Sequence, residues 1–144
     1  LNSDGRLSCA FGSVSFLLAQ DEEEARRWTE HLQLQNQERK AIQDGMTREC
    51  FKQASEQYQA GRNSLCVFLE GGHPGVHGIC ASRVKEAFGR PVVVFSPKNE
   101  DPARLTGSAR SIDGLHLRDV LQSIHDRFPG VIERFGGHKG AAGL

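Results

Sequence analysis

The sequence of 144 residues lacks a long apolar segment. A membrane-spanning helix needs about 18 consecutive apolar residues, and no stretch approaches that length. No N-terminal secretory signal pattern is present either. We therefore expect a soluble, cytoplasmic protein with no membrane partner.

Paired cysteines are also missing. The four cysteines form no C-x-x-C motif and no compact disulfide framework; they are Cys9, Cys50, Cys66 and Cys80. Since such an arrangement is typical of intracellular proteins, we expect reduced thiols.

Recognisable catalytic motifs are absent as well. No group of Asp and His residues has the spacing of a metal-dependent hydrolase, and there is neither a nucleophile elbow nor a P-loop. The sequence offers groups that bind anions but no evident catalytic machinery.

Excess charge of either sign is absent from the whole chain, which has 18 basic and 18 acidic side chains. A field from the whole molecule therefore cannot attract nucleic acid. The charges are unevenly divided, because residues 1–61 hold 7 basic and 10 acidic side chains and residues 62–144 hold 11 and 8. The second part, with a net charge of +3, is the better candidate to bind an anion.

A long helix is predicted from Asp21 to about Ala60. Asp21 can cap it, and the acidic residues 22–24 suit a first helical turn. Residues on one stripe recur at steps of three or four, apolar at both ends and polar at Asn36 and Arg39. Gly45 is a weak point where the helix could bend. A helix this long predicts a strut between domains.

The region after residue 61 predicts a small α/β domain. Strands are expected at residues 64–69, 91–95 and 105–111, helices at 76–88 and 115–128, and a connector or short strand at 131–135. The fold class is therefore α/β, with a long helix followed by a small mixed-sheet domain flanked by helices.

The segment 72–83 is a glycine-rich turn that leads into a helix carrying Arg83. This geometry suits a phosphate at the helix N-terminus. A metal site at His73, His77 and Cys80 is disfavoured, because Pro74, Gly75 and Gly78 should break the helix that i, i+4 ligands need. His77 is better explained by a packing role.

The predicted strand 105–111 combines hydroxyl and guanidinium groups. Alternation places Ser108, Arg110 and Thr106 on one face, and Gly107, Ala109 and Ser111 on the other. The first face can grip a phosphate. An ordinary edge strand with outward polar residues is the alternative.

The C-terminal segment Phe135–Gly143 places His138 after Gly136 and Gly137, ahead of small residues that could open a helix. Backbone N–H groups and an imidazole could together meet an anion there. The alternative is a glycine-rich turn before a short helix.

Segments in order along the chain resemble one family: residues 1–7, the long helix at 24–25 and 36–39, Gly75–Arg83, Arg90–Val92, Gly107–Leu115 and Phe135–Gly143. The last four are similar to the DHH-associated domain of RecJ-type single-stranded-DNA exonucleases. The first two resemble the end of the family's DHH catalytic domain and its connecting helix. By this resemblance, residues 1–19 are a remnant of the DHH domain, 20–61 the connecting helix and 62–144 the DHH-associated domain.

The resemblance implies a full-length 5′-to-3′ exonuclease for single-stranded DNA in repair and recombination. Its cofactor would be Mn²⁺ or Mg²⁺, bound outside this chain, which alone would be inactive. Single-strand-binding protein and a helicase would be partners of a monomeric enzyme. Implied substrate-binding residues are Arg83, Ser108, Arg110, Ser111, Gly136, Gly137, His138, Asn2 and Arg6. His138 would lie near the scissile phosphate in a supporting role.

Three positions depart from the family's pattern. Gly72 stands where the family usually has Trp, His77 where it has Ile or a similar residue, and Ala109 where it has Gly. Ala109 should cost little unless its φ is positive. A stand-alone nucleic-acid-binding module and a phosphodiesterase for short oligonucleotides or cyclic dinucleotides remain alternative functions.

Overall fold

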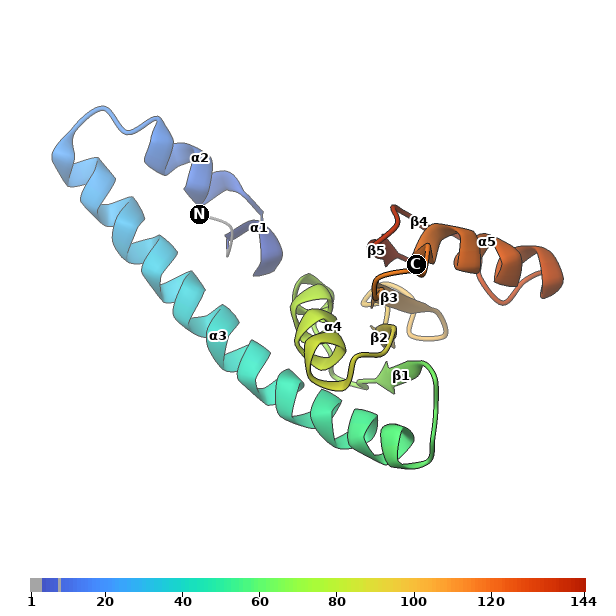
Figure 1. Ribbon diagram of the computed structural model, residues 1–144. Coiled ribbons are helices and arrows are strands. Elements are labelled where there is room, and N and C mark those ends of the chain that lie inside the picture. The colour runs from blue at the N-terminus through green and yellow to red at the C-terminus, as the bar shows by residue number, and fades with distance from the viewer. Residues whose placement is uncertain (1–3, 8) are drawn as a thin grey trace. The chain divides into compact units, whose positions relative to one another are not determined.

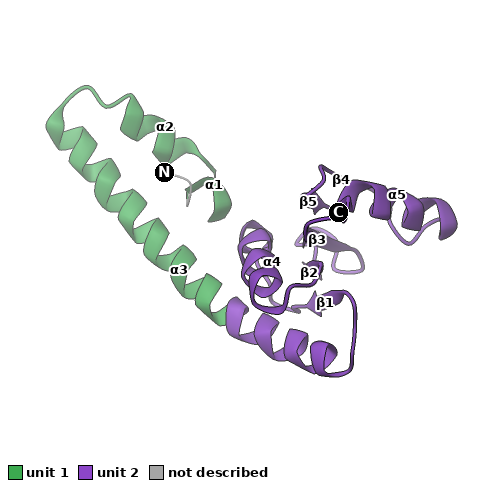
Figure 2. Cartoon of the chain, viewed as in Figure 1, with its two compact units in different colours: residues 1–45 green, residues 46–144 purple. Residues whose placement is uncertain are grey.

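The computed structural model describes residues 4–7 and 9–144 (Figure 1). The chain forms two compact units, residues 1–45 and 46–144, coloured separately in Figure 2. The domain boundaries expected after residues 19 and 61 stay predictions. Within the described residues, no helix is both long and apolar enough to cross a membrane.

The first unit holds α1 (Asp4–Leu7), α2 (Phe11–Leu17) and the first part of α3 (Glu22–Gln59). The Phe11 and Trp28 rings pack edge to face with their centroids 5.9 Å apart. Asp4 is 1% exposed, and its carboxylate accepts the N–H of Ser13 at 2.9 Å and lies 3.6 Å from Nε2 of His31. These contacts hold the two short helices against α3.

The predicted long helix is confirmed as α3, which has 38 residues. The Glu24 N–H donates to Oδ1 of Asp21 at 2.8 Å, so Asp21 caps the helix as its position predicts. The expected weak point at Gly45 does not interrupt the helix. In the polar middle of the stripe, the Arg39 guanidinium donates to Oδ1 of Asn36 and to Oε1 of Gln43.

The second unit is built on a five-stranded mixed sheet of order β1-β2-β3-β5-β4. The strands are β1 (Leu65–Phe68), β2 (Val92–Pro97), β3 (Leu105–Arg110), β4 (Gly136–Gly137) and β5 (Ala141–Gly143). Only the β1–β2 pair among these is parallel, and α4 (Pro74–Phe88) connects it. The predicted fold class is confirmed.

Helices cover both faces of this sheet (Figure 1). On the α4 face, strand and helix side chains are fully buried; they are Leu65, Val67, Val92 and Val94 from the strands, and Val76, Ala81 and Val84 from α4. On the other face, α5 (Leu117–Arg127) packs Leu117 and Leu121 against Ala109, Ile132 and Ala142. This alternation is the one predicted for β3.

The outer edge of β1 is covered by two glutamines of α3. The side-chain amide of Gln57 donates to the Cys66 carbonyl at 2.6 Å and accepts the Cys66 N–H at 2.9 Å. Gln53 makes the same pair of bonds with Phe68, at 2.8 and 3.0 Å. The four backbone groups that an edge strand would leave open are therefore satisfied.

Two expectations about local structure are wrong. Residues 136–143 form the β4–β5 hairpin instead of opening a helix, because β5 finds backbone partners along β3. Helix α4 begins at Pro74 and contains Gly75 and Gly78, so these residues do not break it. Proline suits the first helical turn, where its missing N–H costs nothing.

The four cysteines are free thiols, as predicted; Cys50 and Cys80 are buried and Cys9 and Cys66 exposed.

Candidate functional site

Ser108 and Arg110 of β3 project toward α4, on the same face of the sheet. A Cβ atom added to Gly78 of α4 would overlap Nη2 of Arg110 and lie 3.2 Å from its Cζ and 3.3 Å from Oγ of Ser108. The guanidinium and the hydroxyl thus converge on one glycine. The predicted pairing of these two side chains on one face is confirmed.

Hydrogen bonds hold the guanidinium of Arg110 in this position. Its Nε donates to Oγ of Ser82 at 3.2 Å, and its Nη1 donates to the carbonyl of Ala109 at 2.8 Å. The Ser82 hydroxyl in turn donates to the carbonyl of Gly78 at 3.0 Å. A positive charge is therefore fixed beside a hydroxyl, which is a chemistry suited to phosphate.

Arg83 and Ser111 occupy different surroundings. Arg83 lies on α4, one residue beyond Ser82, and its side chain is exposed. Ser111 is 8% exposed, and its hydroxyl donates to the carbonyl of Leu115 at 2.9 Å. The structure therefore does not bring Ser111 together with Ser108 and Arg110.

The hairpin with Gly136, Gly137 and His138 lies on the same sheet as β3. Ser108 pairs with Gly143 and Arg110 with Ala141, and β4 follows β5. Two strand spacings put β4 about 10 Å from β3. The His138 side chain is exposed, and its backbone N–H donates to the carbonyl of Ala141 at 2.8 Å.

Two further predicted site residues belong to the first part of the chain. Asn2 lies outside the described residues. Arg6 is exposed on α1 of the first unit.

The backbone at Ala109 is unstrained, because no described residue other than glycine has a positive φ. The departure from the family's glycine at this position is therefore tolerated, as expected.

The two departures at Gly72 and His77 are neighbours in space. A Cβ on Gly72 would lie 2.8 Å from Cβ of Leu69 and 3.2 Å from Nε2 of His77. His77 is 1% exposed, in agreement with the packing role, and its Nε2 has no hydrogen-bond partner among the described residues. Burial, together with the charge of His73, lowers the pKa of His77 to about 4, so the imidazole is neutral at pH 7.

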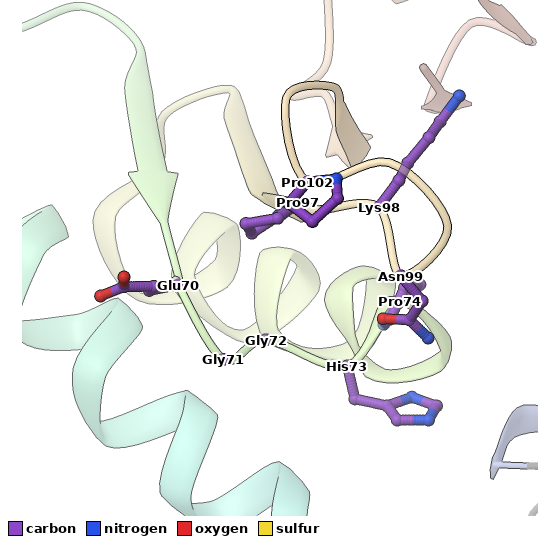
Figure 3. A pocket seen from close by; sticks show the side chains of 9 residues that line it. All are labelled: Glu70, Gly71, Gly72, His73, Pro74, Pro97, Lys98, Asn99 and Pro102. Atoms are coloured by element: carbon purple, nitrogen blue, oxygen red, sulfur yellow. The ribbon is translucent and has the colours of Figure 1, made fainter.

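A cavity of about 460 Å³ lies at the N-terminal end of α4, between the loops after β1 and β2. Its lining includes the backbone of Gly71 and Gly72 and the rings of three prolines. Figure 3 shows the side chains of Glu70, His73 and Lys98 pointing in different directions. His73 also uses its Nδ1 to accept the Gly75 N–H, at 3.2 Å. The charged groups of the lining do not converge, in contrast to the surroundings of Arg110.

The described residues do not form a site for a bound metal ion. Over residues 4–7 and 9–144, no three side chains of His, Cys, Asp or Glu gather as ligands.

Sequence reasoning did not place Gly78 and Ser82 in the site. They stand one helical turn apart on α4 and face Arg110. Their i, i+4 spacing within a predicted helix is a signal of a shared face, but only the packing shows which strand they meet.

Comparison with known families decides what kind of domain surrounds this site. The DHHA1 domain model matches residues 61–144. The chain belongs to the DHHA1 family. The match covers the sheet, α4, α5 and all the residues around Arg110.

The DHHA1 chain is also similar to several single-stranded-DNA-specific exonucleases RecJ. It is 43% identical to the protein of Escherichia coli over 148 residues, and 41% identical to that of Haemophilus influenzae over 147. Each alignment covers 100% of this chain and 25% of the relative. The chain thus spans about a quarter of the length of these curated relatives.

Solved structures show the same likeness. RecJ of Thermus thermophilus in complex with Mn²⁺ matches with a TM-score of 0.84 and 31% identity, covering 99% of this chain and 20% of that one. The Mg²⁺ complex of RecJ from the same organism matches with a TM-score of 0.82 and 30% identity, covering 99% and 21%. The DHHA1 chain is therefore similar to one part of enzymes whose structures contain Mn²⁺ or Mg²⁺.

Proposed function

We propose that this DHHA1 chain is the DNA-binding part of a RecJ-type exonuclease. Ser108 and Arg110 bind a phosphate of single-stranded DNA, and Arg83 contributes a second cation from α4. The observation that carries the proposal is the convergence of the Arg110 guanidinium and the Ser108 hydroxyl at Gly78. A fixed arginine beside a hydroxyl binds phosphate without reading the base.

The hairpin would supply a second wall of the same site. Gly136, Gly137 and His138 face the scissile phosphate in this proposal, with His138 in a supporting role. Ser111 steadies the end of β3 through its bond to Leu115. The likeness to RecJ also makes Asn2 and Arg6 candidate substrate-binding residues.

The whole enzyme would degrade single-stranded DNA from the 5′ end, using Mn²⁺ or Mg²⁺ held outside this chain. We further propose that this enzyme is cytoplasmic and monomeric, and that it works in DNA repair and recombination with a single-strand-binding protein and a helicase. These finer roles rest on the likeness to RecJ.

Replacement of Arg110 by Ala tests the phosphate role. Loss of one charged contact should weaken binding of a labelled single-stranded oligonucleotide by roughly 10- to 100-fold. The loss should be equal for different sequences, and the salt dependence should become shallower by about 0.7 in log–log slope. Fluorescence anisotropy at several salt concentrations measures both effects.

Arg127→Ala is the matched control, because it removes one exposed positive charge from the end of α5 in the same unit. Its affinity should stay within about twofold of the parent. Equal losses in the two variants would mean that only net charge matters. A change in sequence preference on losing Arg110 would contradict the phosphate role.

A further inference from the structure

Arg110 has a long, flexible side chain, yet it is held on helix α4 by residues that bind no substrate in the proposed function. An arginine that can rotate loses conformational entropy when it grips a phosphate. An arginine already fixed does not lose it at that step. The residues that fix Arg110 should therefore increase its affinity for phosphate.

Ser82 provides the hydrogen-bonded part of this support. Its Oγ accepts from Nε of Arg110 at 3.2 Å and donates to the Gly78 carbonyl at 3.0 Å. The hydroxyl proton is thus directed at the helix backbone, which leaves an oxygen lone pair for the guanidinium. Alanine at this position would remove the acceptor and leave the helix intact.

Gly78 provides the space. A Cβ there would overlap Nη2 of Arg110 and press on Cζ at 3.2 Å and on Ser108 Oγ at 3.3 Å. The nearest obstacle is the end of a flexible side chain rather than backbone. An alanine would consequently move the guanidinium and not the helix.

We propose that Ser82 and Gly78 form an arginine seat on α4 that positions the Arg110 guanidinium for phosphate. Ser82 and Gly78 are positioning residues, since they act through Arg110. The inference rests on the proposed function, because the seat can aid binding only if Arg110 itself binds phosphate. It adds that glycine at position 78 serves ligand binding at the expense of helix stability.

Gly78→Ala gives the sharpest test. Alanine favours the helix more than glycine, so the melting temperature should stay the same or rise. Affinity for a single-stranded oligonucleotide should nevertheless fall about tenfold, since the guanidinium is displaced. If Gly78 served packing alone, Gly78→Ala would lower or raise the melting temperature and the oligonucleotide affinity together.

Ser82→Ala and Ser82→Thr test the hydrogen bond. The Arg110 Nε–H signal in a ¹⁵N correlation spectrum reports the bond directly through its exchange with water. Ser82→Ala should speed this exchange and weaken oligonucleotide binding about tenfold. Ser82→Thr keeps a hydroxyl and should restore both, while Ser123→Ala on the exposed side of α5 should change neither.

The outcomes separate the seat from the proposed function. If Arg110→Ala weakens binding as expected but Ser82→Ala and Gly78→Ala leave the affinity and the Nε–H exchange unchanged, the seat is overturned and the phosphate role stands. If Arg110→Ala leaves binding unchanged, the phosphate role fails. The seat's function then fails with it, even where the exchange data show that Ser82 holds the guanidinium.

Discussion

The two adjacent glycines of β4, Gly136 and Gly137, differ in the space available for a side chain. A Cβ on Gly137 would overlap the carbonyl oxygen of Ala141 and lie 2.5 Å from Cα of Ala142. The obstacle is backbone, so the two strands of the hairpin must separate to admit a side chain. Gly136 has no neighbour within 4 Å of an added Cβ among the described residues. Only one of the pair is required for packing.

Gly137→Ala should therefore destabilise the protein by about 1–3 kcal/mol, the usual cost of forcing atoms into a packed site. Gly136→Ala is the matched control and should unfold at the same denaturant concentration as the parent, or slightly higher. Chemical denaturation followed by circular dichroism measures the difference. Equal midpoints for the two variants would contradict the close approach at position 137.

His77 makes stability depend on pH. Its pKa falls from 6.5 in the unfolded chain to about 4 in the folded one, because burial disfavours the charged imidazole. Protons therefore bind more tightly to the unfolded chain, and stability falls as the pH drops from 6.5 toward 4. The full effect of this side chain is about 3 kcal/mol.

His77→Leu should flatten this part of the pH profile, because leucine fills a similar volume and cannot be protonated. The measurement is the free energy of unfolding at pH 7, 5.5 and 4.5. Ser123→Ala, an exposed change on α5 that involves no titratable group, should leave the profile unaltered. A profile equally steep in His77→Leu would assign the acid sensitivity to other groups.

At the scale of elements, α3 completes the sheet. Gln53 and Gln57 are one helical turn apart, about 6 Å. Cys66 and Phe68 are two strand residues apart, about 6.6 Å. The spacing of the two glutamines along α3 therefore matches the spacing of the two residues along β1. Each side-chain amide can take the place of a peptide group in a neighbouring strand. The edge of β1 is thereby closed to pairing with another chain.

Replacing both glutamines by alanine should expose this edge. The Cys66 and Phe68 amide protons should lose protection in hydrogen exchange, and stability should fall by about 1–3 kcal/mol for the four bonds lost. Self-association at high concentration should rise, as measured by analytical ultracentrifugation.

Gln59→Ala is the control for this pair, because that exposed side chain bonds locally, to Oγ of Ser55 at 3.4 Å. It should preserve the protection of both amides. Unchanged exchange at Cys66 and Phe68 in the double variant would show that the amide bridges are unimportant in solution.

At the scale of the whole molecule, the described residues offer groups suited to binding an anion. The described residues bring a cation and a hydroxyl together at Gly78 but gather no set of metal ligands. With 18 charges of each sign, a general electrostatic attraction cannot replace a local site. The proposed function predicts that this chain binds single-stranded DNA and does not cut it by itself.

This expectation is tested by incubating the purified chain with 5′-labelled single-stranded DNA and Mn²⁺. The label should remain on full-length DNA over hours, while a Mn²⁺-dependent nuclease in the same buffer degrades it. Cleavage that follows the chain through successive columns and stops on addition of chelator would contradict the expectation.

Local chemistry was sufficient to predict much of the fold. The 3.6-residue stripe and the Asp21 cap predicted α3, and the alternation in residues 105–111 predicted which face of β3 carries Ser108 and Arg110. These features depend on residues close in sequence. The same reasoning failed at residues 136–143, where small residues fit a helix start and a hairpin equally well, and pairing with β3 decided between them.

The sequence by itself determined α3, α4 and α5, most of the strands, and the placing of a hydroxyl and a guanidinium on one face of β3, because periodicity, capping and side-chain type are properties of neighbouring residues. Only the tertiary structure decided that Ser82 and Gly78 meet Arg110, that Gln53 and Gln57 close β1, and that Gly72 adjoins His77. Each of these contacts joins segments that local patterns treat separately. Their geometry follows from how helices, strands and loops pack, which no local pattern specifies.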